Sequence, residues 1–166
     1  MLKTRIMVDL RDLERLTMMY PKISMDVRES KLTEAMALLE RAVKLKTPEG
    51  AGPIHLRDSI HPKVSISGKK VKGLLGTPLA HGEPREFGTK PHFPPIGPIQ
   101  HWVEKKLGKS GDEAKSIAFA IAITIARRGT KGAHMFDKGF EENEAQVKRI
   151  LESIPAEIIT RLRKNR

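Results

Sequence analysis

A proline-rich stretch near the middle of the chain limits the fold more than any other feature. Residues 90–98 contain four prolines and one glycine. Proline removes a hydrogen bond from a helix interior or from a sheet ladder, so neither element can continue through this stretch. We therefore expect one group of elements before residue 90 and another after residue 98, joined by a stiff loop.

Two helices are predicted before the loop, within residues 9–47. Leucines at positions 10, 13 and 16 recur at helical spacing, and Pro21 interrupts the pattern. Asp26 and Glu29 have the spacing of a capping box, which predicts that the second helix begins there. An apolar stripe follows, and Pro48 predicts that this helix ends near Thr47.

A small antiparallel sheet of about three to four strands is predicted within residues 58–89. Residues 59–66 and 70–77 have the composition of two strands, and Ser67-Gly68-Lys69 between them suits a hairpin turn. A third short strand is predicted at residues 85–88. Pro84 lacks an N–H group, so this strand is expected to be short or to lie at an edge.

Helices are predicted again from residue 98 to residue 163. Pro98 suits the first turn of a helix that runs to Leu107. Ser110 and Glu113 have capping-box spacing and predict a helix through Arg128, apolar nearly all round and therefore buried between layers or subunits. A long amphipathic helix is predicted beyond residue 135, broken or kinked at Pro155.

The order of these elements predicts an α+β fold in which a small antiparallel sheet packs against N-terminal and C-terminal helices. The 166 residues fit a single domain, and we find neither an internal repeat nor a linker between domains. We divide residues 1–166 into N-terminal helices (9–47), a hairpin and sheet (58–89), a proline-rich loop (90–98) and C-terminal helices (98–163).

Composition narrows the classes of protein. The chain has no cysteine, which excludes disulfides, thiolate zinc sites and a cysteine nucleophile. The apolar run at 117–126 is much shorter than the roughly 20 residues of a membrane-spanning helix, and the first residues lack the apolar core of a signal peptide. We therefore expect neither membrane insertion nor secretion.

The formal net charge of +11 has two interpretations. The lysines and arginines either solvate helix faces or form a surface that meets nucleic acid or an acidic protein. Aromatic residues make up 4% of the chain, which leaves few rings for stacking on bases. Any DNA contact is therefore expected to be electrostatic and independent of base sequence.

A search for catalytic chemistry gives no site. The six histidines do not form the helical pair with a nearby glutamate that is typical of zinc hydrolases. Glu83 and Glu86 raise the hypothesis of a metal-dependent nuclease, but the catalytic lysine expected close behind a strand carboxylate is not evident. The glycines around residue 75 lack a phosphate-binding pattern. We predict no catalytic residue, no metal and no cofactor.

Glu86-Phe87-Gly88-Thr89, followed by the proline-rich loop, is the most informative motif. It belongs to an ordered set of elements spread over roughly residues 30–145. The others are Thr47-Pro48, Gly52, Leu56-Arg57-Asp58-Ser59-Ile60, Ala126-Arg127-Arg128-Gly129-Thr130-Lys131-Gly132 and His134-Met135-Phe136. Together they resemble the tail-completion, or head–tail joining, proteins of lambdoid and related siphophages, which are also described as minor tail or head–tail connector components.

This resemblance implies a structural virion protein and not an enzyme. The expected subunit forms a ring, hexameric by this resemblance, at the neck between head and tail, assembles in the host cytoplasm and lets DNA pass. Its expected partners are copies of itself, head-completion or stopper proteins, and tail-terminator or tail-tube proteins. The motif residues expected to shape the interface are Glu86, Phe87, Gly88, Thr89, Pro94, Pro95 and Trp102, with Phe87, Phe93 and Trp102 as anchors.

Basic residues form a second candidate surface, which faces either the DNA in the lumen or an acidic partner. They are Lys69, Lys70, Lys72, Arg127, Arg128 and Lys131. Two other functions remain open, a phage-encoded metal-dependent nuclease and a sequence-independent DNA-binding protein.

Overall fold

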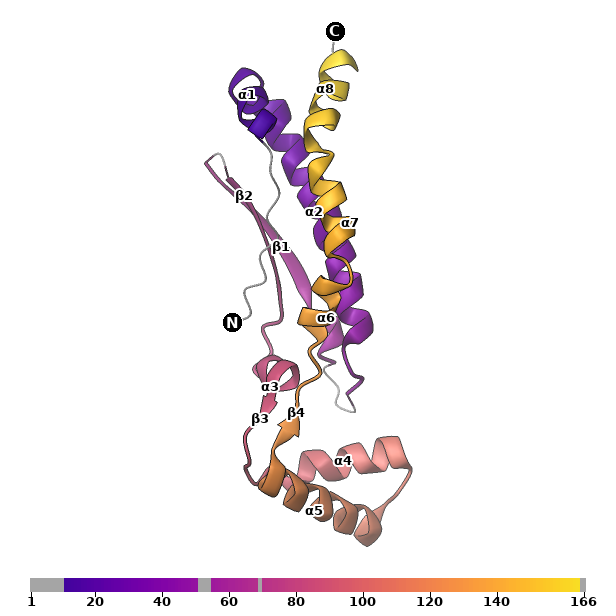
Figure 1. The fold of residues 1–166 in the computed structure, drawn as a ribbon. Coiled ribbons are helices and arrows are strands. Elements are labelled where there is room, and N and C mark those ends of the chain that lie inside the picture. The colour runs from indigo at the N-terminus through magenta and orange to yellow at the C-terminus, as the bar shows by residue number, and fades with distance from the viewer. Residues whose placement is uncertain (1–10, 51–54, 69, 165–166) are drawn as a thin grey trace. The chain divides into compact units, whose positions relative to one another are not determined.

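The computed structural model describes residues 11–50, 55–68 and 70–164. They fall into two compact units, which we describe separately (Figure 1). The hairpin unit comprises residues 46–60 and 77–135, and the ribbon unit comprises the described parts of residues 2–45, 61–76 and 136–166. The predicted α+β class is confirmed, but the described strands form two separate two-stranded sheets instead of one larger sheet. The single domain stays a prediction.

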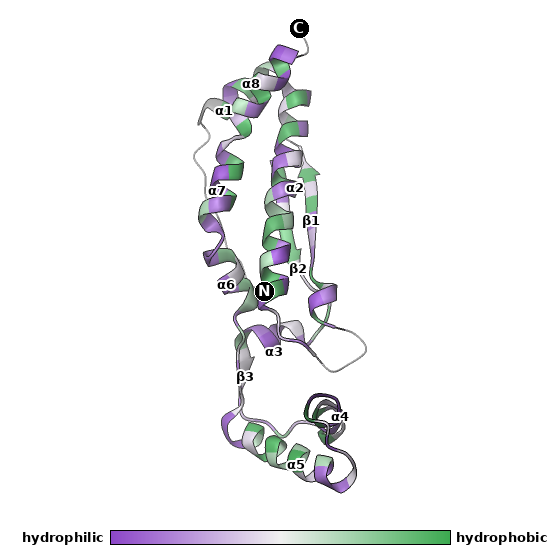
Figure 2. Ribbon diagram, turned by 90° about the vertical axis from the view of Figure 1, so that its right-hand side faces the viewer, coloured by the Kyte–Doolittle hydropathy of each residue, from purple (hydrophilic) through white to green (hydrophobic). Residues whose placement is uncertain are grey.

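The ribbon unit consists of one long helix flanked by shorter helices and a two-stranded ribbon. Its elements are α1 (Arg11–Met19), α2 (Pro21–Lys46), β1 (His61–Ser67), β2 (Lys70–Gly76), α6 (Met135–Glu141), α7 (Glu144–Glu152) and α8 (Ile154–Lys164). Figure 2 shows α2 between the ribbon and α7. The apolar residues of α2 therefore have partners on two sides.

The start of α2 differs from the prediction. The helix begins at Pro21, because a missing N–H and a fixed φ suit the first turn, and Asp26 and Glu29 lie inside it instead of capping it. Tyr20 is the single residue between α1 and α2. Its N–H donates to the carbonyl of Leu16 (2.9 Å), and its own carbonyl accepts from Ser24 (3.0 Å), so helical hydrogen bonding continues across the junction.

Two buried clusters hold the ribbon unit together. In the first, buried α2 residues pack with Val147 of α7 and with partly buried side chains from the ribbon and from α6. These α2 residues are Ala35, Met36 and Leu39, and the partly buried ones include Val64, Leu75 and Phe140. In the second cluster, Leu13 and Val27 pack with Ile154 and Ile158 of α8. The predicted apolar stripe of α2 is thus confirmed as core.

The predicted hairpin is confirmed, with shifted ends. β1 and β2 pair antiparallel from His61 with Gly76 to Ser67 with Lys70. Residues 57–59 form a 3-10 turn instead of the start of the strand, because the Ser59 hydroxyl donates back to the carbonyl of Leu56 (2.8 Å).

The predicted C-terminal helix is interrupted twice. α7 ends at Glu152, and α8 begins at Ile154 with Pro155 in its first turn, so the predicted break at this proline is confirmed. A further break between α6 and α7 was not predicted. There the Asn143 side chain donates to the carbonyl of Gly139 (2.9 Å), which replaces a backbone hydrogen bond.

The hairpin unit contains the proline-rich loop and the apolar helix that follows it. Its elements are the 3-10 turn Arg57–Ser59, α3 (Gly82–Phe87), β3 (Gly88–Thr89), α4 (Ile96–Leu107), α5 (Gly111–Arg128) and β4 (Thr130–Lys131). α4 begins two residues before the predicted Pro98, and α5 has the predicted extent, although the Ser110 side chain makes no capping hydrogen bond. Within the described residues, no helix is both long enough and apolar enough to cross a membrane.

Two helical glycines provide a test of the packing in α6. A Cβ added to Gly139 would lie 2.7 Å from Val43 Cγ2 and 3.1 Å from the Val43 backbone nitrogen, whereas one added to Gly97 in α4 meets open space. Gly139→Ala should therefore lower the free energy of unfolding by about 1–3 kcal/mol, since the gain in helix propensity is smaller than the overpacking cost.

Gly97→Ala is the matched control, and it should be neutral or stabilising by up to about 1 kcal/mol. Chemical denaturation of both variants and the wild type measures the difference. Equal stability of the two variants would contradict a close approach of α6 to the backbone of α2.

Candidate assembly interface

The two motifs that flank the α4–α5 hairpin pair with each other. β3 and β4 are antiparallel, with Gly88 opposite Lys131 and Thr89 opposite Thr130. The hydroxyl oxygens of Thr89 and Thr130 lie 2.9 Å apart, and the Thr130 N–H donates to the Thr89 hydroxyl (3.2 Å). The Glu86–Thr89 segment and the loop after α5, distant in sequence, thus form one local structure.

Three glycines allow the backbones of these motifs to meet. A Cβ added at Gly88, Gly129 or Gly132 would lie less than 3.0 Å from the carbonyl oxygen of Thr130, Thr89 or Glu86, respectively. Gly88 (φ 81°) and Gly129 (φ 69°) also have left-handed backbone conformations that other residues rarely adopt. Glycine is therefore required at Gly88 both by its positive φ and by the close approach of the Thr130 carbonyl.

The predicted third strand is mostly wrong. Residues 82–87 form the helix α3, and strand pairing begins only at Gly88. Pro84 lies in the first turn of α3, where its missing N–H has no helical partner to lose, so it suits a helix start as well as an edge strand. β4 was not predicted, although Thr130 and Lys131 between two glycines were a weak signal of it.

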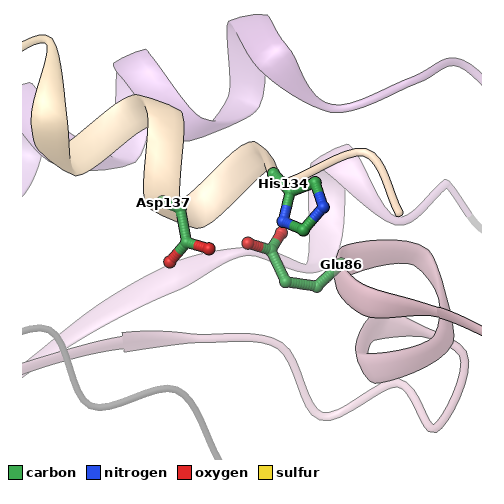
Figure 3. Close-up of side chains that lie close together, drawn as sticks. All are labelled: Glu86, His134 and Asp137. Atoms are coloured by element: carbon green, nitrogen blue, oxygen red, sulfur yellow. The ribbon is translucent and has the colours of Figure 1, made fainter. Parts of the chain in front are cut away.

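Glu83 and Glu86, which the sequence analysis considered together, differ in burial. Glu83 is exposed, whereas Glu86 is 1% exposed although both belong to α3. Figure 3 shows the side chains of Glu86 and His134 directed toward one another, and a ligand atom of each lies within 4.8 Å of the other. Asp137 follows in the first turn of α6. The carboxylate and imidazole types present here are ones that bind divalent metals.

His134 belongs to the His134-Met135-Phe136 motif but was not predicted as a site residue, and its backbone is unusual. Its φ is 52°, and among the described residues no other residue apart from glycines has a positive φ. Its N–H donates to the carbonyl of Glu86 (3.1 Å), and Ala133 donates to Arg85 (2.8 Å). These bonds hold the segment after β4 against α3 and extend the pairing of the two motifs.

The α4–α5 hairpin leaves aromatic side chains exposed. Phe93 is 57% exposed and Phe119 is 49% exposed, and their rings meet edge to face with centroids 6.2 Å apart. α5 packs mainly against α4, through Ala114, Ala118 and Ala122, and Figure 2 shows it as largely apolar. Within the described residues, α5 is thus fully covered only on its alanine side, and its expected burial between layers or subunits stays a prediction.

The other motif residues differ in exposure. Pro94 is buried and Trp102 is half-buried. Phe87 is 49% exposed, and Phe93 and Pro95 are also exposed. The anchoring role of Phe87, Phe93 and Trp102 stays a prediction.

The predicted basic residues do not form one patch on one unit. Lys70 and Lys72 are exposed on β2 of the ribbon unit, and Lys69 lies outside the described residues. Arg127 and Arg128 in the last turn of α5 and Lys131 on β4 are exposed in the hairpin unit. The two groups must be considered separately.

An open cavity of about 290 Å³ in the hairpin unit lies beside the 3-10 turn. Charged and polar residues line it, including Glu49, His55, Asp58 and Lys106. Glu49 contacts both Arg57 (3.6 Å) and Lys106 (3.3 Å), so its charge is offset within the chain. In the ribbon unit, partial burial lowers the pKa of Arg28. An arginine nevertheless stays protonated in proteins, so this shift provides no acid or base for catalysis.

Gly88→Ala tests the pairing of the motifs, with Gly108→Ala as its matched control. Both glycines have positive φ, but only at Gly88 would a Cβ meet backbone atoms. Gly108→Ala should cost about 1–2 kcal/mol from backbone strain alone, and Gly88→Ala should cost at least about 1 kcal/mol more. Denaturant unfolding measures both. Similar losses would show that β3 and β4 do not approach as closely as described.

Comparison of the chain with protein-family models, curated proteins and solved structures found no match. The likeness to tail-completion proteins therefore depends on the ordered motifs alone.

Proposed function

We propose that the chain is a structural virion protein of a tailed bacteriophage, a tail-completion or head–tail connector subunit that forms a ring, joins tail to head and lets DNA pass. The observation that carries the proposal is the aromatic pair Phe93–Phe119, about half exposed on a hairpin whose longer helix is apolar. Exposed apolar clusters of this kind typically mark protein interfaces. The occupant we propose is a second copy of this chain.

A ring with head-to-tail contacts needs two different surfaces on each subunit. The ribbon unit has a second exposed apolar cluster, at the junction of α1 and α2. There Met18, Met19 and Tyr20 are 79%, 59% and 38% exposed. Methionine adapts to irregular surfaces and its sulfur packs well against aromatic rings, so this cluster suits the Phe93–Phe119 pair of a neighbouring copy.

The charges of α5 also suit self-association. Asp112 and Glu113 lie in its first turn, and Arg127 and Arg128 lie in its last turn. Each copy therefore offers both signs of charge at the two ends of one apolar helix. Opposite charges at the rim of an interface direct the encounter and fix its register. The partners outside the ring are proposed to be the head-completion or stopper protein and the tail-terminator or tail-tube protein.

The double substitution Phe93→Ser and Phe119→Ser should abolish self-association with little loss of folding, because both rings are already about half exposed. Sedimentation velocity over a range of concentrations and electron microscopy of the particles measure assembly. The wild type is expected to form closed rings at high concentration, and the variant is expected to sediment as a folded monomer.

The matched control is Leu45→Ser with Ile159→Ser, which removes two other exposed apolar side chains, 70% and 41% exposed. It should assemble like the wild type. Equal loss of assembly in the control, or a wild type that remains monomeric at every concentration, would contradict the proposed interface.

The pairing of Glu86 with His134 supports one alternative, a metal-dependent nuclease. Plasmid cleavage with magnesium or manganese tests it, using Glu86→Ala with His134→Ala and Glu83→Ala as the control at an exposed position. Metal-dependent cleavage that is lost only in the double variant would refute the structural proposal.

A further inference from the structure

We propose that the outward face of the β1–β2 ribbon binds the phosphate backbone of duplex DNA. The lysine face comprises Lys63, Ser65, Ser67, Lys70 and Lys72, and the exposed Leu74 lies on the same face opposite Lys63. The inference deepens the proposed function, because it names the surface through which a neck protein would contact the genome. It depends on that function only for its biological setting, and it is testable on the isolated protein.

The strand register places these five residues on one face. Ser65 is opposite Lys72 and Ser67 is opposite Lys70, while Lys63 lies two residues before Ser65 on the same strand. Side chains alternate between the faces of a strand, so all five lie on the face opposite to Val64 and Leu75. Val64 and Leu75 pack into the cluster formed with α2, and the five residues of the lysine face are all exposed.

The charge of this face is not balanced within the chain. The sequence from residue 61 to residue 76 contains no aspartate or glutamate. His61 contacts Glu40 of α2 (3.3 Å), but among the described residues no carboxylate lies within ion-pair distance of Lys63, Lys70 or Lys72. Elsewhere in the same unit Lys31, Lys44 and Lys148 each pair with a helix glutamate.

This concentration of like charge works against the stability of the ribbon. Like charges on neighbouring positions of a sheet are unfavourable, and an isolated two-stranded ribbon is only marginally stable in water. A bound polyanion removes this repulsion and releases its own counterions. The repulsion among the lysines, which destabilises the free chain, thus favours binding of the polyanion.

The spacing of the residues suits a nucleic-acid backbone. Successive residues on one face of a strand are about 6.8 Å apart, which is on the scale of the separation between phosphates along a nucleic-acid backbone. Lys70 and Lys72 can therefore contact separate phosphates, and the hydroxyls of Ser65 and Ser67 can donate to phosphate oxygens beside them.

The composition of the face favours duplex DNA over other polyanions. Residues 61–76 contain no phenylalanine, tyrosine or tryptophan, and the ring of His61 contacts Glu40, so they offer little platform for stacking on the bases of a single strand. Protein interfaces are depleted in lysine, which argues against an acidic protein as the principal partner. The contact is therefore expected to be with phosphates and independent of base sequence.

The test is fluorescence anisotropy with two unrelated duplexes of equal length over a range of salt concentrations. Three phosphate contacts add about −2.7 to the slope of log K against log salt, which is about a 40-fold loss of affinity between 50 and 200 mM salt. Lys63→Gln with Lys70→Gln and Lys72→Gln should remove this part of the slope for both duplexes.

The charge-matched control is Lys31→Gln with Lys44→Gln and Lys148→Gln, which lowers the net charge equally and should leave the slope within about one of the wild type. A second variant, Ser65→Glu with Ser67→Glu, keeps every lysine and should also abolish binding. Circular dichroism verifies that each variant is folded.

Equal weakening by the control, no binding of the wild type to either duplex, or tighter binding to poly-glutamate or to single strands would overturn the inference. Lost DNA binding with intact ring assembly in the lysine variant would support it. Intact ring assembly in the phenylalanine variant with DNA binding retained would instead refute only the proposed interface.

Discussion

The pairing of β3 with β4 is the constraint on which the hairpin unit depends. Thr89 and Thr130 are 41 residues apart in the chain, and their hydrogen bond closes the excursion that contains the proline-rich loop, α4 and α5. Closing a flexible loop of this length costs on the order of 3 kcal/mol in chain entropy. The prolines at 91, 94, 95 and 98 lower that cost because they restrict the unfolded chain. The glycines then let the two backbones approach closely enough for the pairing to form.

The sequence predicted the elements whose signals are local. The end of α2 before Pro48, the start of α5 after Ser110 and the break at Pro155 all follow from residues within one turn of the boundary. The start of α2 was misplaced because Pro21 suits a first turn as well as an interruption. A capping-box spacing at Asp26 is also satisfied by chance inside a continuous helix.

The elements that sequence reasoning missed depend on partners distant in the chain. β4 is two residues long, and its strand conformation comes from pairing with β3 rather than from the propensity of Thr130 and Lys131. His134 joined Glu86 through this same pairing, so no local pattern could single it out. Phe87 and Phe93 are about half exposed among the described residues, so their expected role as anchors depends on contacts that the sequence does not specify.

The exposed residues form two kinds of surface, one apolar and one basic, and the two suit different partners. The Phe93–Phe119 pair is apolar, and its burial gains free energy from water release only against a partner of matching shape. The lysine face of the ribbon needs only a regular array of negative charge, and its contribution falls as salt rises. The proposed ring subunit would need both kinds of contact, a specific one with protein and a sequence-independent one with DNA.

Neither the apolar pair nor the lysine face requires catalytic chemistry. The apolar pair and the unbalanced lysines lie on the surface, where they contribute little to folding and, for the lysines, oppose it. Glu86 and His134 lie at the paired motifs, and their backbones also hold the segment after β4 against α3. The backbone positions of Glu86 and His134 are therefore explained by a structural role. A chemical role would require an activity that is lost when their side chains are replaced while the fold stays intact.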